Sequence, residues 1–207
     1  MQLETLLIRP DRTHLHGASP AQADMTGIRT LFTTMGTTSV LISFDFRSAE
    51  SITGSYLRAT ILWTLLSGKE FAEGMAAAAS SDPWAIRPLP LYPVVIAKSD
   101  EVLGEIDDFL KQRNRACLAL KSPESIPFAQ ALLLGKVDGF LIDTLKLLAE
   151  RGPSVAQSLK EASNERISIG GWSNRLADLY SHRLVMRMRD GKSWIYQTLS
   201  KEHTPWA

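Results

Sequence analysis

The run SVLISFDF at residues 39–46 restricts the fold more than any other stretch of the chain. Apolar and β-branched residues fill almost every position, which indicates a strand buried on both faces. A strand of this kind lies inside a sheet that helices cover. The run therefore predicts a layered α/β unit, whose other strands and helices should come from the neighbouring sequence.

The neighbouring segments alternate between strand and helix patterns up to about residue 122. Strands are predicted at residues 2–8, 93–97 and 116–120, and helices at 20–35, at 51–68 and after Ser99. The segment 69–91 is irregular and is interpreted as an insertion. Residues 1–122 are therefore predicted to form one domain, a mixed sheet with helices packed on it.

A different pattern follows a predicted linker at residues 123–136. Residues 137–207 show three helical stretches and then an alternating run on both sides of Asp190-Gly191, a strong signal for a β-hairpin. Ser154 with Gln157 predicts a capping box at the second helix, and Ser168 predicts the cap of the third. These residues are expected to form a second domain.

The third helical stretch contains the pair Gly170-Gly171 near its start. Glycine costs about 1 kcal/mol in a helix relative to alanine. The pair therefore favours a late helix start, near Trp172, over a close approach of the backbone to a phosphate. On the hairpin, Trp194 and Tyr196 share one strand face and are expected to be core residues rather than residues that stack on bases.

The stretch SNRLADLYSHRLVMRMRDGKSWIYQTL at residues 173–199 resembles the recognition helix and wing of winged helix-turn-helix domains in bacterial transcription regulators. The resemblance extends over about residues 138–199. It implies a recognition helix near residues 172–181 and a basic wing at 187–192, both contacting double-stranded DNA. The implied DNA contacts are Ser173, Asn174, Arg175, Arg183, Arg187, Arg189 and Lys192.

Local charge agrees with that resemblance. From residue 166 to residue 192, six cations face two acidic residues, which gives a local charge of about +4, although the whole chain carries only +1. A helix fits the major groove, and a hairpin can lie on the adjacent backbone. Charged strand faces also serve solubility alone, and winged helices also bind proteins.

The N-terminal half is similar to the STAS-like domains of bacteria, relatives of the anti-sigma factor antagonists. The similarity rests on SVLISFDFRSAESITGSYLRATI and on the later strand, helix and strand of YPVVIAKSDEVLGEIDDFLKQRNRACLAL. It implies a domain that binds a protein partner or a small ligand without catalysis. Gly54 stands where those antagonists carry a phosphorylated serine. Thr53 and Ser55 are alternative acceptors, although capping the helix is the commoner use of such residues.

Catalysis and cofactor binding find no support in the sequence. The single cysteine, Cys117, lies in the apolar run ACLAL and is expected to be a buried thiol. His14 and His16 are interpreted as a solvated loop pair, and no metal site, cofactor motif, phosphate loop or nucleophile elbow is predicted. The chain is expected to be cytoplasmic and free of the membrane, because no apolar run is long enough to span it.

Together these patterns predict a DNA-binding regulator whose N-terminal domain docks a partner or ligand. A homodimer is expected, because two half-sites multiply specificity. The alternative is a protein–protein adapter in a defence or stress-signalling complex. A third reading, an enzyme built on unrecognised residues, would need a polar cleft between the domains.

Overall fold

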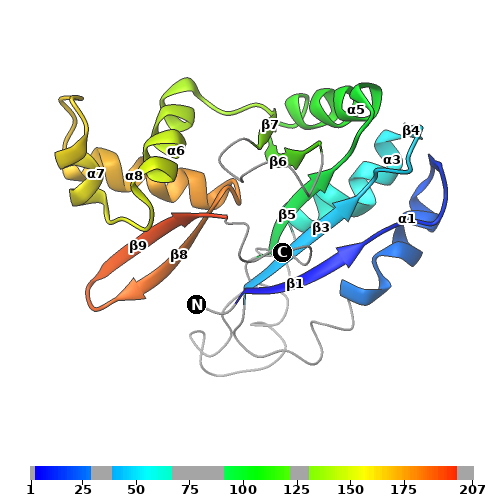
Figure 1. The fold of residues 1–207 in the computed structure, drawn as a ribbon, viewed down its shortest axis with the longest axis horizontal. Helices are drawn as coiled ribbons and strands as arrows, with labels where there is room; N and C mark the ends of the chain where they lie inside the picture. The colour runs from blue at the N-terminus through cyan, green and yellow to red at the C-terminus, as the bar shows by residue number, and fades with distance from the viewer. Residues whose placement is uncertain (1–2, 29–38, 67–90, 122–130, 200–207) are drawn as a thin grey trace.

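The computed structural model describes residues 3–28, 39–66, 91–121 and 131–199 (Figure 1). A mixed five-stranded sheet forms the centre of the fold, in the order β1–β3–β5–β6–β7. Its strands are β1 (Leu3–Ile8), β3 (Ser39–Asp45), β5 (Leu91–Ile96), β6 (Ala116–Leu120) and β7 (Leu132–Gly135). The first four run parallel to their neighbours, and β7 pairs antiparallel with β6. The predicted α/β class and mixed sheet are confirmed.

The helices on this sheet lie together on one face. The parallel strands are neighbours in chain order, and right-handed crossovers in such an order place every connecting helix on the same side. These elements are α1 (Ala18–Asp24), α3 (Gly54–Leu57), its π-helical continuation η1 (Arg58–Leu62), and α5 (Asp100–Lys111). Figure 1 shows them side by side on that face. Ile42, Phe44, Tyr56 and Ile106 are fully buried in the layer between them and the sheet.

The opposite face of the sheet is equally apolar. Leu41, Tyr92 and Val94 point to this side and are fully buried. They belong to one continuous core with C-terminal side chains that include Trp172 and Leu184. The C-terminal elements therefore cover a face of the sheet that its own helices leave bare.

The C-terminal elements follow the predicted order of three helices and a hairpin. They are α6 (Gly139–Arg151), α7 (Ala156–Ala162), α8 (Ile169–Ser181), β8 (Val185–Asp190) and β9 (Ser193–Thr198). An isolated antiparallel bridge joins Ser154, between α6 and α7, to Tyr196 on β9. This bridge places a third extended segment beside the hairpin.

Several predicted boundaries differ from the structure. Residues 132–135 of the predicted linker form β7, which is an edge strand of the sheet. Two short strands in segments predicted as loop and helix, β2 (His14–Leu15) and β4 (Ser51–Ile52), pair in parallel. The predicted insertion at 69–90 and residues 29–35 of the predicted first helix lie outside the described residues.

The structure confirms two of the predicted helix caps and contradicts the predicted capping box. The Ser99 and Ser168 hydroxyls accept hydrogen bonds from the backbone N–H of Val102 and Gly171, as predicted. The capping box at Ser154 is wrong. Two backbone hydrogen bonds of 2.9 Å hold Ser154 against Tyr196, so α7 begins only after Val155. None of the described helices is long and apolar enough to cross a membrane.

Candidate nucleic-acid interface

Helix α8 divides cleanly into a buried face and an exposed face. Trp172, Leu176 and Leu179 recur at helical spacing and are all buried. Ser173 and Asn174 lie on the other face and are exposed, as the sequence predicted. The Ser168 cap starts the helix at Ile169, so the predicted late start near Trp172 is wrong. Both glycines lie in the first turn.

Arg175 has a different environment from the predicted DNA contact. Its guanidinium bonds the Glu165 carboxylate twice, with Nη2–Oε2 at 2.7 Å and Nη1–Oε1 at 3.0 Å. It also lies 5.1 Å from the ring centroid of Phe140 and 5.2 Å from that of Trp172. The hydrogen bond from Arg175 holds the pKa of the Glu165 carboxyl below its ordinary value. Only 15% of the Arg175 side chain is exposed, so it fixes α8 to the preceding loop instead of facing outward.

Three of the predicted contact residues form a row with two aromatic rings. Arg183 lies 5.5 Å and Arg187 3.9 Å from the ring centroid of Tyr180. Arg187 also lies 4.3 Å from the Trp194 ring, and Arg189 lies 5.0 Å from the same ring. We call these five residues the arginine–aromatic row. It runs from the end of α8 along the hairpin.

Strand register produces this row. Side chains at alternate positions of β8 share a face, which brings Arg187 and Arg189 to the same side. The antiparallel register then places Trp194 directly opposite Arg189. Trp194 is 36% exposed, so the expectation that it is a core residue is wrong, whereas Tyr196 is buried as expected.

No ion pair with a described residue neutralises the positive charge of the row. Across residues 3–28, 39–66, 91–121 and 131–199, no acidic side chain lies within ion-pair distance of Arg183, Arg187, Arg189 or Lys192. Arg189 Nε donates to the Gly191 carbonyl at 3.0 Å, at the exposed turn that also holds Lys192. Guanidinium groups held over aromatic faces keep several N–H donors for phosphate oxygens.

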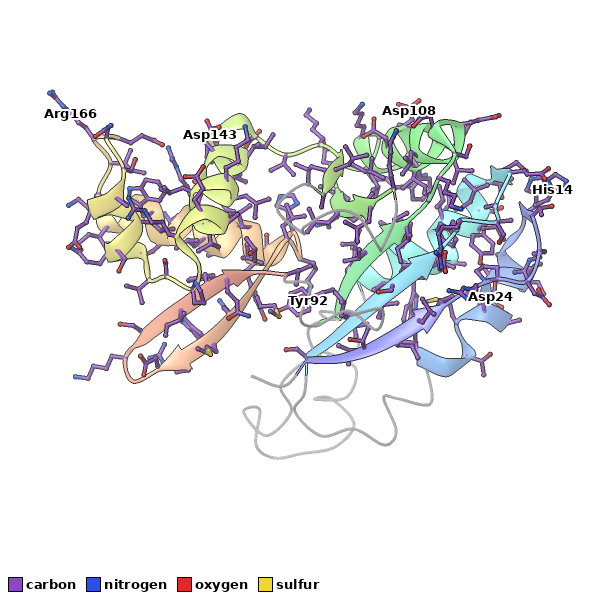
Figure 2. All side chains as sticks on the ribbon, in the orientation of Figure 1. His14, Asp24, Tyr92, Asp108, Asp143 and Arg166 are labelled. Atoms are coloured by element: carbon purple, nitrogen blue, oxygen red, sulfur yellow. The ribbon has the colours of Figure 1, made fainter. Side chains whose placement is uncertain are left out.

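Arg166 and His182 lie outside the row. Figure 2 shows Arg166, counted in the local charge, pointing outward at the far end of the molecule from the sheet. His182 ends α8 and is half-buried. Burial lowers the pKa of its imidazole, and the positive charge of Arg115 lowers that pKa further, so His182 is mainly neutral at pH 7.

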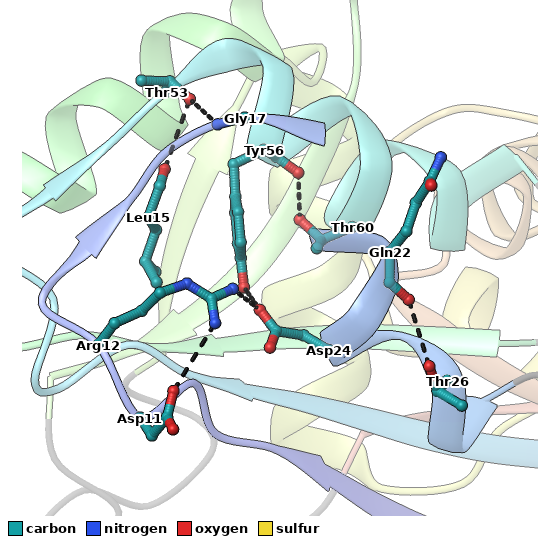
Figure 3. A network of polar contacts seen from close by, with 10 residues as sticks. All are labelled: Asp11, Arg12, Leu15, Gly17, Gln22, Asp24, Thr26, Thr53, Tyr56 and Thr60. Atoms are coloured by element: carbon teal, nitrogen blue, oxygen red, sulfur yellow. Dashed lines mark hydrogen bonds and ion pairs between the residues drawn. The ribbon is translucent and has the colours of Figure 1, made fainter. Parts of the chain in front are cut away.

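Thr53 and Ser55 lie at the start of α3, beyond the sheet from the row (Figure 1). The Thr53 hydroxyl donates to the Leu15 carbonyl at 3.4 Å and accepts from the Gly17 backbone N–H at 3.3 Å (Figure 3). It makes no capping bond to the helix, so the predicted capping role of its side chain is wrong. Thr53 instead joins the loop before α1 to α3. Ser55 is exposed and contacts Thr53 at 3.1 Å.

Two partly buried polar networks centre on Asp24 and Asp45. In Figure 3, Asp24 on α1 binds the Arg12 guanidinium and accepts a 2.5 Å hydrogen bond from the Tyr56 hydroxyl. Burial raises the pKa of that phenol, and the Asp24 bond raises it further. Asp45, 2% exposed at the end of β3, binds Arg9 Nε at 2.7 Å and Arg47 Nη2 at 2.8 Å.

Acid should weaken the fold through Asp45. Burial raises the pKa of this carboxyl, but hydrogen bonds from Arg47 and Arg9 outweigh burial and hold the pKa below its ordinary value. A lowered pKa in the folded state gives stability that is present above pH about 4 and is lost as pH falls below it. Urea unfolding of Asp45→Asn, compared with the wild-type chain from pH 7 down to pH 3, should show a smaller loss of stability in the variant. An equal loss in both would contradict this role.

The two loop histidines are organised by a serine. His14 Nδ1 lies 3.0 Å and His16 Nε2 lies 2.9 Å from the Ser51 hydroxyl oxygen. Both rings are exposed, as expected of a solvated pair, but His14 lies in β2 and His16 directly follows that strand. No group of three or more potential metal ligands occurs within the described ranges. Cys117 is buried and reduced, and burial raises the pKa of its thiol to about 12.

Comparisons of the sequence with protein-family models, with curated proteins and with solved structures gave no match.

Proposed function

We propose that the chain is a DNA-binding regulator and that it contacts double-stranded DNA through α8 and the β8–β9 hairpin. The observation that carries this proposal is the arginine–aromatic row. Its three guanidinium groups are held on rings and have no carboxylate partner in the described part of the chain. Duplex DNA presents closely spaced phosphates, which are the ligands that such a surface fits.

The connectivity of the C-terminal elements supports a winged-helix reading of this region. Helix α8 follows α7 after a short loop, and a hairpin follows α8 at once. The bridge from Ser154 to Tyr196 adds the third strand segment that a winged helix has beside its hairpin. In this reading Ser173 and Asn174 face the groove, while the row lies along the phosphates beside it.

The N-terminal α/β unit is proposed to be a STAS-like domain that docks a partner or ligand. The helices on one face and the buried β3 strand support that reading. If phosphate regulates this unit, Ser55 is the better acceptor of the two predicted residues. Its side chain is exposed, whereas the Thr53 hydroxyl is engaged by Leu15 and Gly17.

A protein–protein adapter is the second candidate. Phe140 and Ile169 are 44% and 45% exposed, at the first turns of α6 and α8. Large exposed apolar side chains favour protein contacts more than phosphate contacts. An adapter would use these two residues, and its binding would depend little on the arginines.

Fluorescence anisotropy with random and self-genomic duplexes tests the proposal. We expect the full chain to bind, with an affinity that falls steeply between low and moderate salt, because bound phosphates release counterions. The double variant Arg58→Ala/Lys98→Ala is the control for a general loss of positive charge. It removes two exposed positive charges from the N-terminal unit, away from the row. Its affinity should stay near that of the wild type. Absence of binding by the folded chain at low salt would reject the DNA proposal and favour the adapter.

A further inference from the structure

The core beneath the β8–β9 hairpin includes one face of the central sheet. Tyr92 lies on β5, in the middle of the sheet, and its side chain is fully buried. Figure 2 places it where the sheet faces the base of the β8–β9 hairpin. The core that contains Tyr92 also contains Leu184 and Val185 at that base, and Tyr180 packs against this core.

Electrostatic effects on Tyr92 come from the same residues. Burial raises the pKa of its phenol and the neighbouring Tyr180 raises it further, while the charges of Arg183 and Arg187 act in the opposite direction. Groups that influence one phenol in this way are close to it in space. These effects agree with the shared core in placing Tyr92 on the side of the sheet that faces the first half of the row.

The backbone at this junction is held in an unusual conformation. Arg183 follows α8 with φ at 62°, in the left-handed region that non-glycine residues rarely occupy. Its backbone N–H donates to the Tyr180 carbonyl at 3.0 Å, and that of Leu184 donates to Leu179 at 3.1 Å. Such a conformation persists where surrounding contacts fix it. Leu184, the next residue, is fully buried in the core shared with the sheet.

We propose that Tyr92 is a positioning residue for the arginine–aromatic row: its ring supports Tyr180, and through Tyr180 it sets the places of the Arg183 and Arg187 guanidinium groups. The inference rests on the proposed function for its biological meaning, because it describes how the N-terminal unit sets the DNA-contacting surface. Binding of a partner that shifts β5 would then alter DNA affinity through packing alone.

Side-chain NMR tests this placement without DNA. Protons over an aromatic face are shifted upfield by the ring current, so the Cδ protons of Arg183, Arg187 and Arg189 report on Tyr180 and Trp194. In Tyr92→Leu, which removes the ring, we expect the Arg183 and Arg187 signals to move toward random-coil values. The Arg189 signal should stay in place, because that guanidinium lies over Trp194 alone among the described rings. Tyr92→Phe retains the ring and should restore the wild-type spectrum.

A matched variant separates positioning from general loosening of the core. Phe44 is a fully buried aromatic residue of β3 that faces the other side of the sheet. Phe44→Leu should destabilise the chain yet leave all three arginine signals unchanged. Equal changes in Phe44→Leu and Tyr92→Leu, or an unchanged Arg187 signal in Tyr92→Leu, would overturn the inference.

DNA titration adds the functional arm. Tyr92→Leu should bind duplex DNA about fivefold more weakly than the wild type, with Tyr92→Phe near the wild type. If the wild-type chain does not bind DNA, the proposed function fails while the NMR result still decides the positioning role. Should Tyr92→Leu not fold, a NOESY spectrum of the wild type decides it, because absent cross-peaks between the Tyr92 and Tyr180 rings would overturn the inference.

Discussion

Alanine at both Arg187 and Arg189 is expected to weaken duplex binding by about tenfold to a hundredfold at low salt. Each guanidinium in contact with a phosphate contributes to counterion release. Losing two should therefore reduce the slope of log affinity against log salt by about 2. Anisotropy titrations at several salt concentrations measure both quantities.

Two comparisons make that result specific. Arg175→Ala removes the same charge, but its guanidinium is bound by Glu165 and mostly buried, so this variant should change the salt slope little. Trp194→Leu keeps all the arginines and removes the ring that orients Arg187 and Arg189. It should lower affinity and keep the slope nearly constant. A slope unaffected by Arg187→Ala/Arg189→Ala would show that these side chains do not contact phosphate.

Trp172→Ala is expected to lower the free energy of unfolding by about 3–5 kcal/mol. Trp172 is fully buried on α8, in the core that also contains the second face of the sheet. Because that core is continuous, the loss should lower the stability of the α/β unit as well. Urea unfolding followed by circular dichroism and by amide exchange of β5 should show one shifted transition.

The control for this prediction keeps an aromatic side chain. Trp172 Nε1 is buried without a hydrogen-bond partner among the described residues. Trp172→Phe therefore removes a polar group that contributes no bond, and it should cost much less than the alanine variant. Two separate transitions, with only the C-terminal one shifted in Trp172→Ala, would indicate two independent domains.

The sequence predicted the sheet well because burial on both faces has a plain signature. Every residue of Ser39–Asp45 is buried, as the run SVLISFDF indicated. The elements that cover the second face of the sheet could not be predicted. An apolar pattern shows that a face is buried, but it does not show which elements bury it. The strand β7 has no signature in the sequence, because four residues are too few to show a period.

The site was predicted in part. The hairpin was predicted correctly, but its two turn residues are Gly191 and Lys192, one position later than an Asp190-Gly191 turn, so Arg189 pairs with Trp194 and not with Lys192. The bond from Arg175 to Glu165 had no such signal, because the two residues are ten apart and Glu165 lies in a loop. Helical spacing therefore predicted the exposed Ser173 and Asn174 of α8 correctly. It predicted wrongly that Arg175, at the edge of that face, points outward.

The apolar second face of the sheet limits how such a chain can be recombined. Leu41, Tyr92 and Val94 would become exposed to solvent if residues 131–199 were deleted or replaced by an unrelated domain. Exposed apolar patches of that kind promote aggregation. A fusion protein that exchanges the C-terminal elements must therefore also exchange the sheet face that they cover. Recombination between genes is expected to give a folded protein only when the α/β unit and residues 131–199 are transferred together.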